Sequence, residues 1–367
     1  MEKSKFLKYL MPTVAWLVIV GYLVYSTRSA VQVSENQKVT EVEIVICDSA
    51  QYGNLVTTPM VSKWIASSGV KLKEQSIKTL KLAELEGRFR SNGFVDQATI
   101  YPTRSGVLKI EISQRRPTLR LLANGYNAYS TAEGYIFASP ASTAVYVPVV
   151  TGDYKPPFPP SFSGDLEQFL REELERLDEK IAEVEREKYP FFEQEKQNNE
   201  DRRELRRMFI KRQWWRLESH EAFDKRVAAL REEKARLRKL YTYRAREIDK
   251  RIDAVTAKQE ALQRDKKKLV KKCEDFRKLI NFVENVDKDD FWGSEIVQII
   301  ASQSQSGELR VSFSVRSGDF KVVFGTVDNM DRKLAKLRTF YRDALKRVGW
   351  QKYRLINVEY RDQVVCK

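Results

Sequence analysis

The sequence predicts an α+β protein with an N-terminal transmembrane helix, a small mixed module, and an antiparallel β-rich domain interrupted by a long helical coiled-coil hairpin. Three observations predict it. Residues 9–27 contain no charged side chain. Much of 41–160 and 285–367 alternates polar and apolar residues between Gly and Pro turns, as is typical of strands. Residues 164–284 instead carry apolar side chains at three- and four-residue steps, which indicates paired helices.

The apolar segment 9–27 is long enough to span a membrane, because about 19 residues at about 1.5 Å each cover roughly 28 Å. Lys3, Lys5 and Lys8 precede it, which sets residues 1–8 on the cytoplasmic side. A cleaved signal peptide is the alternative. Arg28 stands where small residues should precede a cleavage site, which favours a retained anchor and then a polar linker, 28–40.

The charge of the chain leaves several partners open. Its 367 residues carry a net charge of +15, which permits contact with nucleic acid, anionic lipid or an acidic protein and selects none of them. The cysteines, Cys47, Cys273 and Cys366, show no paired spacing, so no zinc or redox motif can be built from them. We expect each to be a small buried or surface residue.

Residues 41–117 are predicted to form a module in the order strand, helix, helix, strand, strand. Thr58 is expected to cap the first helix, with Pro59 at the first helical position and Gly69 at the end. The other predicted elements of the module are a strand at 41–47, a helix at 77–91, and strands at 94–101 and 107–113.

The β-rich domain is predicted in two parts, 118–160 and 285–367, which flank the helical insertion 164–284. Its predicted elements are strands at 118–122, 128–130, 134–138, 145–150, 295–300, 308–315 and 321–325, a helix at 331–348, and a last strand at 353–360 that 363–366 extends.

The helical insertion has a break and a charge asymmetry. Pro190 interrupts the first apolar run, so the first arm of the hairpin should not be one continuous helix. Acidic residues dominate 165–204 and basic residues dominate 205–274. Folding back would therefore set an acidic arm beside a basic one.

No catalytic or cofactor motif stands out, so we predict a protein that is not an enzyme and holds no cofactor or metal. Ser68 and Lys71 fit the Ser-x-x-Lys pattern of penicillin-binding enzymes, but its companion segments are missing. The only histidine, His220, lies among charged residues and is interpreted as a surface side chain. Trp214 and Trp215 lie among Arg and Lys, a mixture able to bind nucleic acid. The anchor places them outside the cytoplasm, so we interpret them as packing residues of the hairpin and expect no nucleic acid partner.

Two stretches resemble the FtsQ/DivIB family of cell-division proteins. Residues 48–117, with the sequence Asn92 to Phe94 and the closing Arg-Arg-Pro at 115–117, resemble a POTRA module. The C-terminal part, from FWGSEIVQII to GWQKYRLINVEYRDQVVC, resembles the β domain of that family, and YVPVVTG at 146–152 resembles its Leu-Pro-x-x-Thr-Gly-like stretch. Anchor, module and β domain also follow in the order of the family, from which the insertion departs.

This resemblance implies a non-enzymatic, single-pass inner-membrane scaffold of the cell-division complex, the divisome. The C-terminus would be periplasmic, and the protein would be enriched at the division septum. Its expected partners are other division proteins, FtsB and FtsL, and no small-molecule substrate is expected. The alternative is another POTRA-bearing component of envelope transport or secretion.

The resemblance also implies a binding site. In the family, the C-terminal strand of the β domain lies at the sheet edge and takes up a segment of FtsB. The matching residues are Tyr360, Asp362, Val364 and Val365. An edge strand carries unpaired backbone groups to which an extended peptide can add. The alternative interpretation is that Tyr360 and Val364 merely pack on the helix at 331–348.

Overall fold

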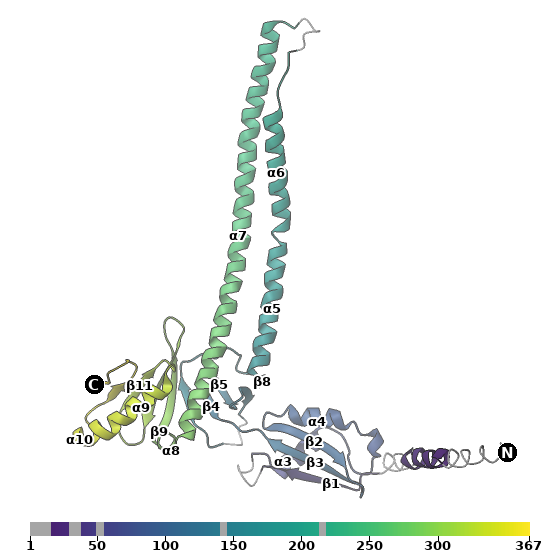
Figure 1. Cartoon of the computed structure of the whole chain (residues 1–367), viewed down its shortest axis with the longest axis vertical. Coiled ribbons are helices and arrows are strands. Elements are labelled where there is room, and N and C mark those ends of the chain that lie inside the picture. The colour runs from purple at the N-terminus through teal and green to yellow at the C-terminus, as the bar shows by residue number, and fades with distance from the viewer. Residues whose placement is uncertain (1–15, 29–37, 49–54, 140–144, 213–217) are drawn as a thin grey trace, which may run out of the picture. The chain divides into compact units, whose positions relative to one another are not determined.

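The computed structural model describes residues 16–28, 38–48, 55–139, 145–212 and 218–367 (Figure 1). Residues 16–28 are helical. Across these ranges, no helix has both the length and the apolar character that a membrane crossing needs. The first part of the predicted anchor, with Lys3, Lys5 and Lys8, lies outside the described residues.

The chain divides into two units. The first comprises residues 1–155, 159–164 and 279–367, and the second comprises 156–158 and 165–278. The first unit holds two sheets, and the second is the helical arm. Each unit is described by itself.

The N-terminal module is a three-stranded sheet with helices, in the predicted order. Its elements are β1 (Glu41–Ile46), α3 (Thr58–Ser67), the 3-10 turn η1 (Ile77–Thr79), α4 (Leu82–Arg90), β2 (Val95–Pro102) and β3 (Val107–Gln114). The central strand β3 pairs in parallel with β1 and antiparallel with β2. Every second residue of β3 is buried, as the alternating sequence predicts, because one face of the sheet packs against the core.

Two details of the module differ from prediction. Thr57, and not Thr58, caps α3, and its side chain makes no capping hydrogen bond. The helix predicted at 77–91 is split, because Leu80 adopts an extended backbone between η1 and α4. Its side chain is buried in the core of the module, which helical periodicity alone does not reveal.

The second sheet of the first unit has ten strands, in the order β13-β12-β11-β10-β9-β7-β4-β5-β6-β8. The strands are β4 (Leu119–Ala123), β5 (Tyr126–Ser130), β6 (Tyr135–Ala138), β7 (Val149–Gly152), β8 (Gly164–Asp165), β9 (Ile296–Gln303), β10 (Leu309–Val315), β11 (Lys321–Gly325), β12 (Leu355–Asn357) and β13 (Val365–Cys366). The prediction of an antiparallel sheet is wrong in part. Strand β7 is parallel to β4 and β9, and β12 is parallel to β11. Parallel neighbours require crossover connections, and a helix makes the one between β11 and β12.

Gly152 explains the end of the YVPVVTG stretch. Its φ is +114°, a conformation that residues with a Cβ rarely adopt. A Cβ there would also collide with the carbonyl oxygen of Ala301 on β9, its partner in the parallel register. Glycine therefore permits the close pairing of β7 and β9.

The C-terminal helix runs almost as predicted, and the last strand does not. Helix α9 (Met330–Phe340) continues through one wider π turn, Tyr341–Leu345, into α10 (Lys346–Val348). The strand predicted at 353–360 is only the three residues of β12. Strand β13 does not extend it but turns back and pairs antiparallel with it.

The helical arm consists of α5 (Leu166–Arg186), α6 (Tyr189–Arg207) and most of α7 (His220–Lys288), followed in the chain by α8 (Asp290–Glu295). In Figure 1, α5 and α6 follow one another along the side of α7. The break at Pro190 is confirmed, since this residue lies in the first turn of α6. Coiled-coil packing in heptads stays a prediction, and Trp214 and Trp215 lie outside the described residues.

Ion pairs join the two sides of the arm, as the charge asymmetry predicts. Lys266 of α7 contacts Asp178 at 2.6 Å, and Lys258 contacts Glu187 at 3.4 Å. At the base of the arm, Arg277 pairs with Glu167. Most of these groups are exposed, so each pair stabilises the arm by only roughly 0.2–1 kcal/mol. The pairs matter more for fixing which residues of α5 lie beside which residues of α7.

The last turns of α7 belong to the first unit. Phe282 is fully buried there, with its ring centre 5.0 Å from that of Phe324 and 6.5 Å from that of Phe313. The predicted insertion, which ends at residue 284, therefore includes a turn of helix that is part of the sheet core.

Candidate partner-binding site

Strand β13 forms one edge of the large sheet, with β12 as its neighbour. Next to β13 in the chain, the backbone N–H of Lys367 donates to the carbonyl of Leu355 at 2.9 Å, and the N–H of Leu355 donates to the carbonyl of Lys367 at 3.0 Å. Donor direction alternates along an antiparallel ladder, so the N–H and C=O of Cys366 point away from β12. Among the described strands none pairs with this outer side. An added strand could bond there.

The loop between β12 and β13 is held by cations of α9. The ammonium of Lys336 donates to the carbonyls of Val358 at 2.8 Å and Gln363 at 3.3 Å, and to that of Tyr360. Arg332 donates to the carbonyl of Arg361 at 2.8 Å. These bonds satisfy loop carbonyls that no strand pairs and fix the backbone beside the edge.

Burial lowers the pKa of Lys336, and the neighbouring Arg332 lowers it further, while Asp362 opposes the shift. Burial also lowers the pKa of Lys333, whose ammonium donates to the carbonyl of Thr326 at 2.6 Å and lies 5.1 Å from the ring centre of Phe324. Both lysines thus lose hydration and gain carbonyl or aromatic contacts.

A polar hollow of about 450 Å³ opens between this loop and α9. It is lined by Thr326, Asp328, Asn329, Arg332, Lys333, Lys336, Glu359, Tyr360 and Arg361. Cations outnumber carboxylates in this lining, and Glu359 is paired with Arg310. The hollow therefore favours an acidic or carbonyl-rich ligand next to the sheet edge.

The four residues implied by the resemblance lie close together in the chain but not on one strand. Only Val365 lies on β13, so the expectation that all four residues lie on the C-terminal strand is wrong. Tyr360 has half of its surface exposed and lines the hollow, and Asp362 is exposed and pairs with Arg332 at 3.6 Å. Val364 and Val365 are partly buried. Partner binding by these residues stays a prediction.

Sequence reasoning missed the cations of α9. Arg332 and Lys333 lie in the first turn of this helix, where the positive end of the helix dipole disfavours a cation. Cations placed against the dipole must be stabilised by other groups, and here loop carbonyls supply them. Two basic residues at the start of a predicted helix were therefore a sign in the sequence that hydrogen-bond acceptors lie close to them.

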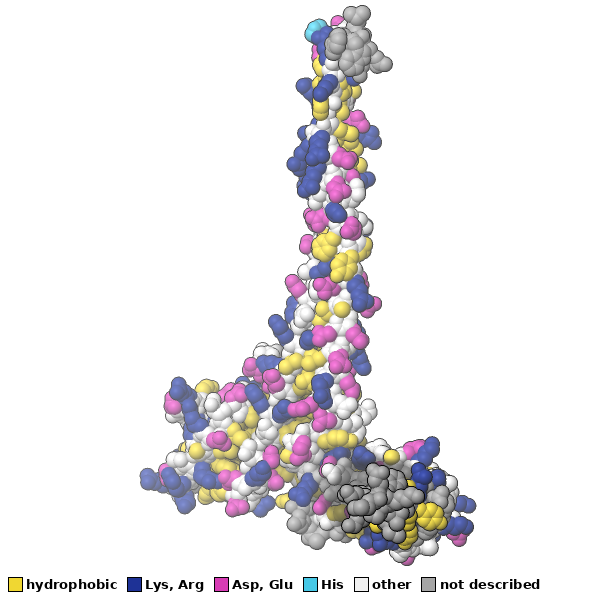
Figure 2. Space-filling view, turned by 45° about the vertical axis from the view of Figure 1, so that its right-hand side comes forward, with side chains coloured by type: hydrophobic (Ala, Val, Ile, Leu, Met, Phe, Trp, Pro, Cys, Tyr) yellow, Lys and Arg dark blue, Asp and Glu magenta, His cyan; other side chains and the backbone are white. Residues whose placement is uncertain are grey.

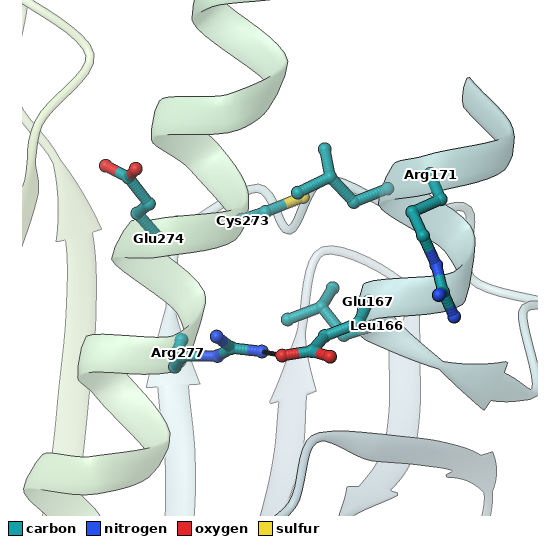
Figure 3. Close-up of a pocket in the computed structure, with 7 residues that line it drawn as sticks. Leu166, Glu167, Arg171, Cys273, Glu274 and Arg277 are labelled. Carbon is teal, nitrogen blue, oxygen red and sulfur yellow. Dashed lines mark hydrogen bonds and ion pairs between the residues drawn. The ribbon is translucent and has the colours of Figure 1, made fainter. Parts of the chain in front are cut away.

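A second pocket, of about 270 Å³, lies at the base of the arm and is lined by Leu166, Glu167, Leu170, Arg171, Cys273, Glu274 and Arg277 (Figure 3). Figure 3 shows the Glu167–Arg277 ion pair spanning it from α5 to α7. Burial raises the pKa of the Cys273 thiol to about 11, so the thiol is protonated and a poor nucleophile. The described residues also contain no cluster of side chains that could hold a metal ion.

Comparison with known proteins finds matches to two domain families. Residues 37–113 match a POTRA-like domain. Residues 249–367, which include the edge, the loop and α9, match the domain described as FtsQ/DivIB, C-terminal related. These two matches confirm the resemblance to the FtsQ/DivIB family. The second match begins inside α7, so part of the predicted insertion lies within the matched domain. No curated protein matches the chain.

Proposed function

We propose that this protein is a non-enzymatic scaffold of the cell-division complex. The observation that carries the proposal is the open outer side of β13, beside a loop held by α9, within the domain that matches FtsQ/DivIB. The POTRA-like domain that precedes it supports the same class. A scaffold needs surfaces that capture partners, and an edge strand with fixed neighbours is such a surface.

In this proposal an extended segment of a partner adds to β13 through the outward N–H and C=O of Cys366. Tyr360 offers an aromatic side chain of the kind that dominates interface energies. The cations of the hollow, such as Arg332 and Arg361, favour acidic side chains in the same segment. We propose FtsB as the source of this segment and FtsL as a further member of the complex.

The proposed location follows from the sequence. Lys3, Lys5 and Lys8 before an apolar segment support a single-pass inner-membrane protein with a cytoplasmic N-terminus and a periplasmic C-terminus. The FtsQ/DivIB match supports enrichment at the septum.

Depletion of the protein in its own cells tests the proposal. Filaments without septa, restored to normal division by the wild-type chain, are expected. Normal division together with a secretion defect would contradict it and would favour another POTRA-bearing component of envelope transport.

A further inference from the structure

The far end of the helical arm carries an exposed group of apolar and basic side chains. We call it the tip patch and define it as Arg206, Arg207, Met208, Phe209, Lys211 and Arg212. Phe209 has 69% of its surface exposed and Met208 has 46%. Two large apolar side chains are thus exposed next to each other and are flanked by basic residues, and an apolar patch with a polar rim is typical of an interaction site.

The backbone of the tip patch is fixed by α7. The ammonium of Lys234 donates to the carbonyl of Met208 at 2.9 Å and to that of Arg206 at 3.5 Å, where α6 ends. The guanidinium of Arg212 donates to the carbonyl of Glu218 at 3.2 Å. These bonds satisfy the end of α6 and fix the backbone of the extended segment that follows it, on which Phe209 is exposed.

All charged side chains of the tip patch are basic. Residues 205–212 contain no Asp or Glu but four Lys and Arg. The ammonium of Lys211 lies 5.3 Å from the ring centre of Phe209, so charge and aromatic surface face the same space. Figure 2 shows Lys and Arg side chains gathered along the upper part of the arm, below the tip.

We propose that the tip patch binds the surface of an anionic lipid bilayer. The tip patch combines basic and apolar side chains, and the surface of an anionic bilayer offers a partner for both. Arg206, Arg207 and Lys211 attract anionic headgroups, and each cation near such a surface contributes about as much as a fivefold change in binding. Met208 and Phe209 insert at the level of the headgroups and upper acyl chains, as apolar side chains of interfacial segments do.

A bilayer fits the tip patch better than an anionic polymer does. A polymer that is held by charge alone requires no exposed Met or Phe. An aromatic platform for stacked bases requires several rings along a groove, whereas the tip patch, as defined by described residues, contains one ring, that of Phe209. This inference does not depend on the proposed partner of β13, since the two surfaces share no residue.

Fluorescence quenching in vesicles tests the proposal with the full chain. Ala222, an exposed residue of α7 near the tip, is changed to Cys and labelled with an environment-sensitive dye, with Cys47→Ser and Cys366→Ser removing the more accessible thiols. The chain is reconstituted in vesicles of phosphatidylcholine alone or with about one third phosphatidylglycerol. A spin-labelled lipid quencher is present both in these vesicles and in added protein-free vesicles, so contact with either bilayer is detected.

Strong quenching is expected only with phosphatidylglycerol. Arg207→Glu with Lys211→Glu should lower the ratio of bound to free tips about thirtyfold or more, from the loss of two lipid-facing cations. The matched control is Lys267→Glu with Lys268→Glu, an equal charge change at exposed positions of α7 away from the tip, which should leave quenching unchanged. Circular dichroism should show the same helicity in all variants.

Phe209→Ser separates insertion from charge. It should reduce quenching while the dependence on phosphatidylglycerol persists. Equal quenching with and without anionic lipid, or an equal loss in the control pair, would overturn the proposal. Unchanged quenching in Phe209→Ser would also overturn it, because it would show attraction to charge without insertion.

Discussion

Tyr360 is the side chain on which the proposed partner contact depends most. It is half exposed, while its carbonyl is held by Lys336, so the ring can change without loss of the loop. Tyr360→Ala should lower the affinity for the FtsB segment by more than about 1 kcal/mol, roughly fivefold, as is usual for aromatic anchors. Isothermal titration calorimetry measures this loss.

Tyr243→Ala is the matched control, because Tyr243 is an equally large exposed side chain on the arm. It should leave both affinity and melting temperature unchanged. If Tyr360→Ala binds as the wild type does, Tyr360 is not an anchor. If it lowers the melting temperature by several degrees, the ring packs on α9 instead.

Cysteine reactivity reports the packing of the arm. Cys273 is buried and its thiol pKa is raised to about 11, whereas Cys47 is exposed. At pH 8 iodoacetamide should modify Cys47 and leave Cys273 almost intact, because the thiolate is the reactive form. The reaction of Cys273 should become faster as the pH rises towards 11. Mass spectrometry of peptides after a short pulse measures both sites, and rapid labelling of Cys273 at pH 8 would show that α5 and α7 separate.

The two backbone N–H groups of strand β13 point in opposite directions: that of Val365 towards β12, and that of Cys366 away from it. Cys366→Pro removes an outward N–H and should weaken binding of the partner segment with little effect on stability. Val365→Pro removes the N–H that the antiparallel register directs towards Asn357 of β12, so it should lower the melting temperature. Calorimetry of binding and of unfolding distinguishes the two effects. Equal partner affinity in Cys366→Pro and the wild type would exclude strand addition at this edge.

The helical arm should be removable only at the correct boundary. Deletion of 165–278 with a short Gly-Ser bridge should leave a chain that melts cooperatively, because the remaining end of α7 keeps Phe282 packed against Phe313 and Phe324. Deletion of 164–284, the insertion predicted from the sequence, removes Phe282 and should prevent folding. Loss of one buried Phe costs roughly 3–5 kcal/mol, a large part of the stability of a domain.

One contact must be repaired in that experiment. Phe158 belongs to the arm unit and packs against Phe276, with ring centres 5.1 Å apart. The deletion exposes Phe158, so both deletion variants should carry Phe158→Ser to prevent aggregation. A 165–278 deletion that still fails to melt cooperatively would show that the arm is part of the core.

Local pattern predicted most elements. The alternation of Leu108, Ile110 and Ile112 gives β3, and the charge asymmetry gives the pairing of α5 and α6 with α7. Both features depend on the type and order of neighbouring side chains, which can be read from the sequence.

Pairing between distant segments was not predictable. The parallel register of β7 and β9 depends on a close approach at Gly152 that no local pattern encodes. The two-residue strand β13 exists because Lys367 meets Leu355 after a reversal held by Lys336 and Arg332. The candidate site therefore came from resemblance for Tyr360 and from the structure for the cations around it.

The topology of the whole chain is a prediction of its own. Lys3, Lys5 and Lys8 should face the cytoplasm and Lys367 the periplasm. Alkaline phosphatase, which is active only outside the cytoplasm, should therefore be active when fused after Lys367. A matched fusion after Lys8 should be inactive. A stable but inactive fusion at Lys367 would contradict the proposed location.

The register between β7 and β9 has a consequence for the order of folding. Thr151 donates a hydrogen bond to Ile299, 148 positions later in the chain. A ribosome adding about 5–20 residues each second needs on the order of ten seconds to make that stretch, during which β7 lacks its second neighbour. Closing so large a loop is slow in an unfolded chain. The arm would shorten this loop if its helices paired first, because in the folded arm Glu167 contacts Arg277, 110 positions away. We therefore expect early pairing within the arm to speed the pairing of β9 with β7.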